Sequence, residues 1–124
     1  MALIGIYVDS KFNIFVRQGD SGTLIINNVP TDNNYKVSLG IVEPDSGNII
    51  KEISANSLTS ARVALNISVQ ETEDIGEGKY LYGIKLSANG KETTVIPNAY
   101  KNAGGCLTIP LPPTFTVLPK LVEG

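Results

Sequence analysis

The stretch "ARVALNISVQ" (Ala61 to Gln70) decides the fold class, because its apolar and polar residues alternate with a period of two. The apolar side chains that fall on one side are Ala61, Val63, Leu65, Ile67 and Val69. Such alternation is typical of a strand with one buried face and one face toward water.

Three other stretches, "YKVSLGIVE", "KYLYGIKLS" and "FNIFV", have the same period. We expect their apolar side chains to face the core: Tyr35, Val37, Leu39 and Ile41; Tyr80, Tyr82, Ile84 and Leu86; Phe12, Ile14 and Val16. Turn signals separate the runs. Asn89-Gly90 is the strongest, because a type I′ hairpin turn needs positive φ at both positions. "EPDSGN" (Glu43 to Asn48) and "NVPTDNN" (Asn28 to Asn34) predict two further turns.

The pattern predicts an all-β fold, an immunoglobulin-like antiparallel β-sandwich of about 8–9 strands with a Pro-rich C-terminal arm. The predicted strands lie near residues 3–8, 12–17, 22–29, 35–43, 48–54, 61–70, 79–88, 91–97 and 113–118. No window of eleven or more residues has a helical period, and "QETED" (Gln70 to Asp74) holds at most one turn. Tyr80 follows Gly78, as in sandwiches where a corner tyrosine bonds back to the upstream backbone.

Length and composition bound the function. With 124 residues, the chain is expected to form one domain, with its core in 1–109 and the last strand and arm in 110–124; strand 3–8 lies at its periphery. A net charge of −2, with scattered basic residues, excludes a nucleic-acid partner. "MALIGIYVD" is too short for membrane insertion and lacks the basic start of a signal peptide. The single cysteine excludes an internal disulfide, and we expect synthesis in a reducing cytoplasm.

"RQGDSGTLI" (Arg17 to Ile25) contains Gly-Asp-Ser-Gly, the letters around the nucleophile of trypsin-like proteases. A serine hydroxyl needs a base to become a nucleophile, and the chain contains no histidine. Gly19, Asp20 and Gly22 are turn formers, so we interpret the motif as a corner between two strands.

The other chemical candidates are weak as well. Without histidine, a zinc site is excluded, and only "TDNN" or "ETED" offers oxygens for calcium. The acids Glu71, Glu73, Asp74 and Glu77 share one polar loop, where we expect them to be solvated. Cys106 begins an apolar run and has no basic neighbour, which favours a small buried side chain. We therefore expect no enzyme, no metal and no cofactor.

The C-terminal stretch changes character after Gly104-Gly105. Its prolines are Pro110, Pro112, Pro113 and Pro119. Proline removes backbone donors and favours extended chain, which predicts an edge strand and an arm that contacts either its own domain or a partner.

"VRQGDSGTLIIN" resembles the opening of the N-terminal β-sandwich domain of phage upper baseplate proteins, where an aliphatic strand leads through Gln-Gly-Asp into a second strand. "GEGKYLYGIKLSANGKETTVI" is similar to a later hairpin of that family, and "FTVLPKLVEG" to its closing strand. The resemblance implies a domain that docks onto the tail. The 124 residues do not include the family's helical linker and trimeric C-terminal part, which fits an excised or stand-alone version of the domain or a different function, so host-receptor binding is not carried over.

These observations predict a structural protein of a phage or prophage tail baseplate, made in the bacterial cytoplasm and located in the virion tail. It would act through contacts with other copies of itself or with other tail proteins. The alternative is an immunoglobulin-like adhesion or carbohydrate-binding module, with Tyr100 in "NAYKN" as the main aromatic candidate.

Overall fold

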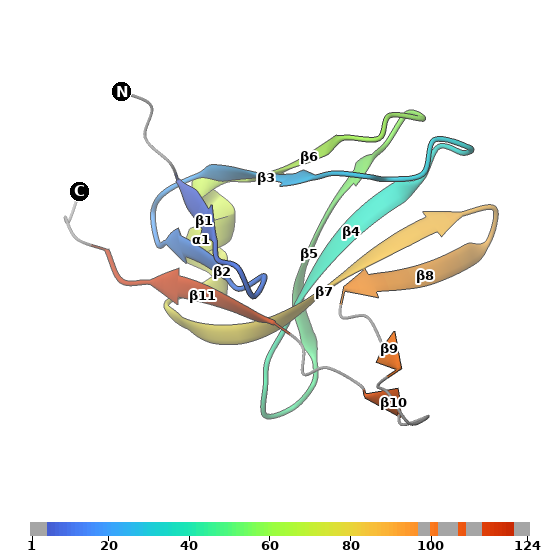
Figure 1. Ribbon diagram of the computed structural model, residues 1–124. Helices are drawn as coiled ribbons and strands as arrows, with labels where there is room; N and C mark the ends of the chain where they lie inside the picture. Colours follow the sequence, from blue (N-terminus) through green and yellow to red (C-terminus); the bar gives the residue numbers. More distant parts are fainter. Residues whose placement is uncertain (1–4, 97–99, 102–106, 109–112, 121–124) are drawn as a thin grey trace.

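A computed structural model describes residues 5–96 and 113–120, together with the backbone of 100–101 and 107–108. The described chain is all-β, with one short helix (Figure 1). Its strands are β1 (Ile6–Val8), β2 (Ile14–Arg17), β3 (Gly22–Ile26), β4 (Lys36–Val42), β5 (Ile49–Asn56), β6 (Val63–Ile67), β7 (Gly78–Ala88), β8 (Lys91–Ile96), β9 (Tyr100–Lys101), β10 (Leu107–Thr108) and β11 (Thr114–Leu118). The helix is α1 (Val69–Ile75).

Seven strands form the larger sheet, in the order β1-β2-β11-β7-β4-β5, and β8 also pairs with β7. One edge of β7 carries β4 along most of its length, so β11 and β8 must share the other edge. β11 takes the first part of that edge, where Thr114 faces Leu81, and β8 takes the second, where Ile96 faces Ile84. The sheet therefore forks along β7 (Figure 1).

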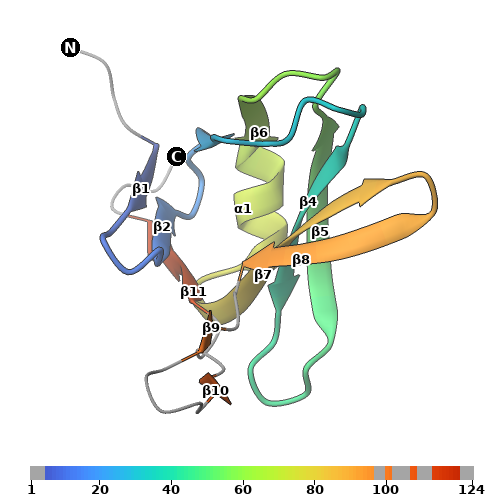
Figure 2. The same ribbon diagram turned by 45° about the vertical axis from the view of Figure 1, so that its right-hand side comes forward.

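A smaller sheet of β3 and β6 lies over the larger one (Figure 2). The two strands pair antiparallel, from Gly22 opposite Ile67 to Ile26 opposite Val63. Their inward side chains meet those of the larger sheet in one core. The core residues are Ile14, Val16, Leu24, Val29, Val37, Leu39, Ile41, Ile53, Val63, Leu65, Ile67, Ile75, Tyr82, Ile84, Leu86, Phe115 and Val117. The period-two prediction is thus confirmed for the centre of each strand, whereas Ala61 and Val69 are exposed.

The predicted strand 61–70 is too long, because the chain turns into α1 after Ile67. Ser68 caps the helix: its side chain accepts a hydrogen bond from the Glu71 backbone, and the Glu71 side chain accepts one from the Ser68 backbone. This capping box satisfies donors that a helix start otherwise leaves unpaired. Ser-x-x-Glu at positions 68–71 was the signal for a helix that the period alone did not predict.

The predicted turns are confirmed where the structure describes them. Asn89 (φ 53°) and Gly90 (φ 78°) form the β7–β8 hairpin turn with the expected positive φ values. The Glu43 N–H donates to the Asn48 carbonyl (2.9 Å) and closes the β4–β5 turn. "NVPTDNN" connects β3 to β4, across the two sheets.

The position of the last strand corrects two predictions. β11 is not an edge strand, because it lies between β2 and β7 inside the larger sheet. It pairs antiparallel with β7 but parallel with β2, where Val117 faces Val16, so the fold is not purely antiparallel. Two side chains of β11, Phe115 and Val117, are almost fully buried in the core.

Phe12 is a further correction. It was assigned to the core with Ile14 and Val16, but its side chain is 61% exposed. Its φ of 67° is in the left-handed region, so the strand begins only at Ile14 and the alternation does not extend back to residue 12.

The expected tyrosine contact is confirmed. The Tyr80 hydroxyl donates to the carbonyl of Ile75 (2.8 Å) or that of Gly76 (3.2 Å), at the end of α1. Because those carbonyls have no partner within the helix, the contact ties α1 to the start of β7.

We expect Phe115→Ala to lower the free energy of unfolding by about 3–5 kcal/mol, because it opens a cavity where β11 meets the core. Thr116→Ala is the matched control, since Thr116 is on the same strand but faces outward. Urea denaturation followed by circular dichroism measures both. Equal effects of the two variants would contradict the burial of Phe115 in the core.

Candidate functional site

The Gly-Asp-Ser-Gly motif forms the corner between β2 and β3, as predicted. Gly19 adopts a φ of 88°, and the Asp20 N–H donates to the Arg17 carbonyl (3.0 Å). The shallow hollow beside Ser21 is lined by Ser21, Gly22, Thr23, Asn66, Ile67 and Ser68. These lining residues include no imidazole, carboxylate or amine that could accept the serine proton as a general base.

The buried Thr72 of α1 holds this corner in place. The Gly19 N–H donates to Thr72 Oγ1 (3.1 Å), and that hydroxyl lies 3.0 Å from the Asp20 carbonyl. Thr72 has no solvent-exposed surface. The sequence pattern predicted this corner but not α1, and the structure shows that a side chain of α1 holds the corner in place.

The acidic residues of "ETED" each have a polar partner within α1 or next to it. Glu71 completes the capping box, Glu73 pairs with Lys120 (2.7 Å), and Asp74 accepts a hydrogen bond from Gln70 (2.8 Å). In "TDNN", Asp32 accepts the Tyr35 hydroxyl (2.9 Å). The described residues contain no group of three or more potential metal ligands.

Two of the four arm prolines are described, and both contact their own domain. The Pro113 carbonyl accepts the Tyr82 N–H (3.1 Å), and the Pro119 carbonyl accepts Arg17 Nη1 (2.7 Å). They bracket β11. Pro110, Pro112, Cys106 and the Tyr100 side chain lie outside the described residues, so their predicted roles remain predictions.

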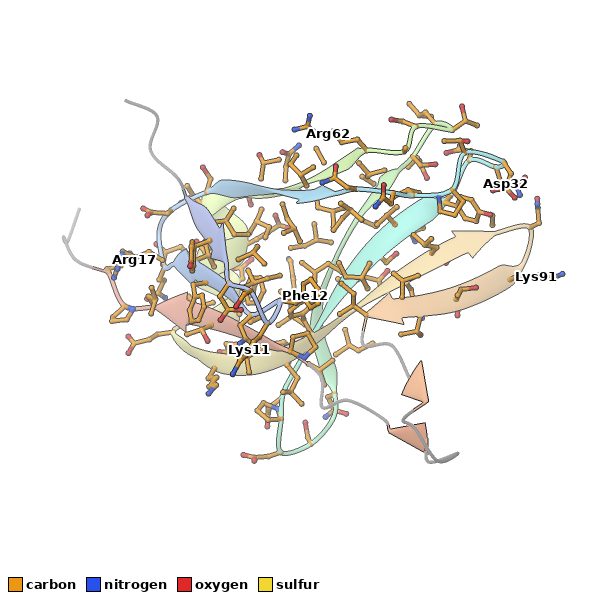
Figure 3. All side chains as sticks on the ribbon, in the orientation of Figure 1. Lys11, Phe12, Arg17, Asp32, Arg62 and Lys91 are labelled. Carbon is orange, nitrogen blue, oxygen red and sulfur yellow. The ribbon has the colours of Figure 1, made fainter. Side chains whose placement is uncertain are left out.

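Exposed aromatic side chains lie on the β1–β2 hairpin. We name them, with their neighbour Phe15, the aromatic patch; it comprises the exposed Tyr7 of β1, the exposed Phe12 of the turn and the partly buried Phe15 of β2. Tyr7 and Phe12 are each 61% exposed, and the Tyr7 and Phe15 rings lie 6.1 Å apart. Figure 3 shows where Phe12 lies relative to the strands. Exposed aromatic side chains on one hairpin favour a contact surface.

Asp9 builds the turn that presents Phe12. Its carboxylate accepts the N–H groups of Lys11 and Asn13, each at 2.9 Å, and the Asn13 side-chain amide at 3.1 Å. The hydrogen bond from the Asn13 backbone is the main reason that the pKa of Asp9 is lowered. The Asn13 side chain also accepts the Thr114 N–H (2.9 Å), which joins the turn to β11.

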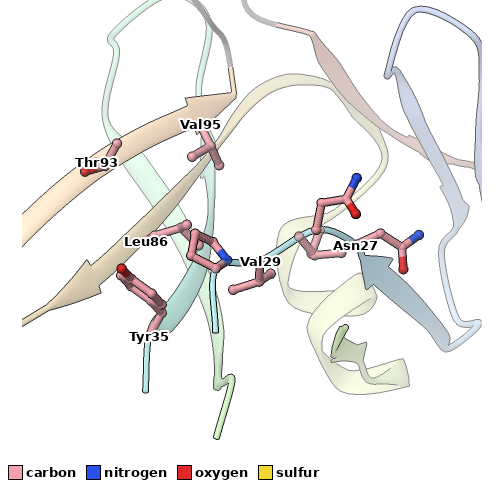
Figure 4. Close-up of a pocket in the computed structure, with 9 residues that line it drawn as sticks. Asn27, Val29, Tyr35, Leu86, Thr93 and Val95 are labelled. Atoms are coloured by element: carbon pink, nitrogen blue, oxygen red, sulfur yellow. The ribbon is translucent and has the colours of Figure 1, made fainter. Parts of the chain in front are cut away.

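A pocket of about 340 Å³ lies between the β3–β4 connection and β8 (Figure 4). Its lining consists of Ile26, Asn27, Asn28, Val29, Pro30, Tyr35, Leu86, Thr93 and Val95. The lining joins an apolar floor to amide and hydroxyl groups and contains no charged residue, so it suits a neutral ligand. Tyr35 was assigned to the core, but its ring is only partly buried there.

Comparisons with protein families, with curated proteins and with solved structures find no match. Within the described part of the chain, no helix is long and apolar enough to cross a membrane.

We expect Thr72→Val to lower the free energy of unfolding by about 1–3 kcal/mol, because the Gly19 N–H and the Asp20 carbonyl lose their partner. Thr72→Ser keeps the hydroxyl and serves as the control. Denaturation midpoints of the two variants provide the measurement. If serine were as destabilising as valine, lost packing rather than lost hydrogen bonds would explain the effect.

Burial and, as the smaller cause, the Asp9 carboxylate together raise the pKa of Tyr82 to about 12. Its hydroxyl donates to the Phe12 carbonyl. The unfolded phenol ionises near pH 10, so the unfolded state loses its proton first and stability falls as the pH rises from about 10 to 12. Below pH 10 this contribution is fully present.

Urea denaturation across that range should show the decline for the wild type and for Tyr7→Phe, but a smaller decline for Tyr82→Phe. A decline of the same size in Tyr82→Phe would assign the pH dependence to other groups.

Proposed function

We propose that this chain is a non-enzymatic assembly protein of a phage or prophage tail baseplate, and that it acts by contacts with other proteins. The aromatic patch is the observation that carries the proposal: two aromatic rings, each 61% exposed, lie on the hairpin at the edge of the larger sheet, Tyr7 on β1 and Phe12 on the turn that Asp9 builds. Burial of such rings against a partner supplies much of the energy of protein interfaces. The corner at Ser21 and the acids of α1 offer no comparable chemistry.

The arrangement of strands supports an immunoglobulin-like sandwich as the finer description. In the larger sheet, β2 pairs parallel with β11, and β7, β4 and β5 follow in that order. β3 and β6 form the opposite sheet. The hydroxyl of Tyr80 bonds back to the backbone just upstream, as in the tyrosine corner of such domains.

The segments that resemble baseplate proteins coincide with structural units. "VRQGDSGTLIIN" covers the end of β2, the corner and β3, and "GEGKYLYGIKLSANGKETTVI" covers β7 and β8. We therefore propose that the partners are further copies of this chain or other tail proteins, and that the chain is located in the virion tail. Nucleic-acid binding and membrane insertion are not part of the proposal.

Carbohydrate binding is the second candidate, favoured by the pocket between the β3–β4 connection and β8. Sugar sites combine an aromatic ring with amide and hydroxyl groups, and Tyr35, Asn27 and Thr93 provide these. Under this alternative, a glycan array would give hits that Tyr35→Ala abolishes.

The test of the assembly proposal is mass spectrometry of tail particles purified from the strain that encodes the chain. We expect the protein in the particles, and we expect a Tyr7→Ser/Phe12→Ser variant to be depleted from them by about tenfold or more, as loss of two buried aromatic contacts implies. Thr116→Ala is the control. Absence of the wild-type protein from the particles would contradict the proposal.

A further inference from the structure

The free edge of β3 is the feature with the clearest unassigned role. β3 pairs with β6 on one side, and no other described strand pairs with it. Gly5 lies against Ser21 and Gly22, so the start of β3 is covered and the open part is residues 23–26. Unpaired N–H and C=O groups along an edge are a template for another strand.

The other sheet edges carry features that discourage pairing. β1 has only three residues; β5 contains Lys51 and Glu52, and its pairing with β4 is irregular near Val42; β8 begins with Lys91 and Glu92. β6 is uncharged, but it contacts β5 and follows Arg62. Charges, short strands and irregular pairing are the usual protections of an edge.

β3 carries no charged side chain, and its pairing with β6 is regular. Its sequence, Gly-Thr-Leu-Ile-Ile, contains no charge and no proline, and Thr23, Ile25 and Ile26 all keep some exposure. Ile26, at the end of β3, and Asn27, directly after it, line the uncharged pocket described above. A strand added here would meet apolar and neutral groups only.

We infer that the open edge of β3 pairs antiparallel with the β3 of a second copy. A two-fold axis brings the same edge from both copies together, and antiparallel pairing is the arrangement that this symmetry produces. The two small sheets then form one continuous sheet, β6-β3-β3-β6. A second copy is favoured over a different partner because an uncharged edge meets itself without like-charge repulsion.

This inference rests on the proposed function, since it names one of the contacts by which the chain would assemble. The strands are short, so the interface belongs to the small, reversible class, and the dimer should depend on protein concentration.

Sedimentation velocity over a concentration series is the first measurement, with Ile25→Lys as the test variant. Lysine at an edge blocks strand addition, so we expect dimerisation to weaken by about tenfold or more. Ala64→Lys is the matched control, because Ala64 is exposed, lies directly opposite Ile25 in the same sheet and is one strand away from the free edge. Circular dichroism confirms that both variants fold.

Cross-linking gives an independent result. In a Cys106→Ser background, Thr23→Cys mixed with Ile25→Cys should form disulfide-linked dimers under mild oxidation, whereas Ala64→Cys should not.

Equal dimerisation of wild type and Ile25→Lys, or a wild type that is monomeric at all concentrations, would overturn the inference. In either case, wild-type protein recovered in tail particles would leave the proposed function standing. A dimer that Ile25→Lys abolishes, in a protein absent from particles, would support the β3 contact and contradict the tail assignment.

Discussion

β11 (Thr114–Leu118) lies between β2 and β7, and the rest of the larger sheet depends on that insertion. Without it, β1 and β2 would have no strand pairing that connects them to β7, β4 and β5. Phe115 and Val117 also fill the core beneath the junction. Because the strand arrives from the far end of the chain, the sheet closes only after nearly all the sequence is available, and long-range contacts of this kind slow folding.

A second constraint joins the two sheets. The corner from β2 to β3 carries the chain from one sheet to the other, and Thr72 binds this corner through a hydroxyl with no solvent exposure. The Tyr80 hydroxyl anchors the other end of the same helix. α1 therefore stabilises the connection between the two sheets. Without Thr72, polar backbone groups of the corner would lose their hydrogen-bond partner, which would destabilise the fold.

The functional proposals rest on two surfaces that have no partner among the described residues: the aromatic patch and the outer edge of β3. Hydrogen bonds from the Asp9 turn hold Phe12 toward solvent, and the small sheet ends at a strand without charged protection. Both features suit contacts with other protein surfaces, and they lie on different sheets. A chain with two such surfaces can join more than one neighbour, as an assembly protein must.

Period-two alternation was enough to predict the all-β class and the inward faces of β4, β6 and β7, and the Asn-Gly turn signal was enough to predict the hairpin at Asn89-Gly90. Both kinds of signal depend on neighbours in the chain. The corner at Gly19 to Gly22 could also be predicted from the local sequence, because turn-forming residues act over only a few positions. The position of β11 and the exposure of Phe12 came only from the tertiary structure. A strand's partners are chosen by distant segments that compete for the same edge, and the alternation along β11 is the same whether it lies at an edge or between β2 and β7.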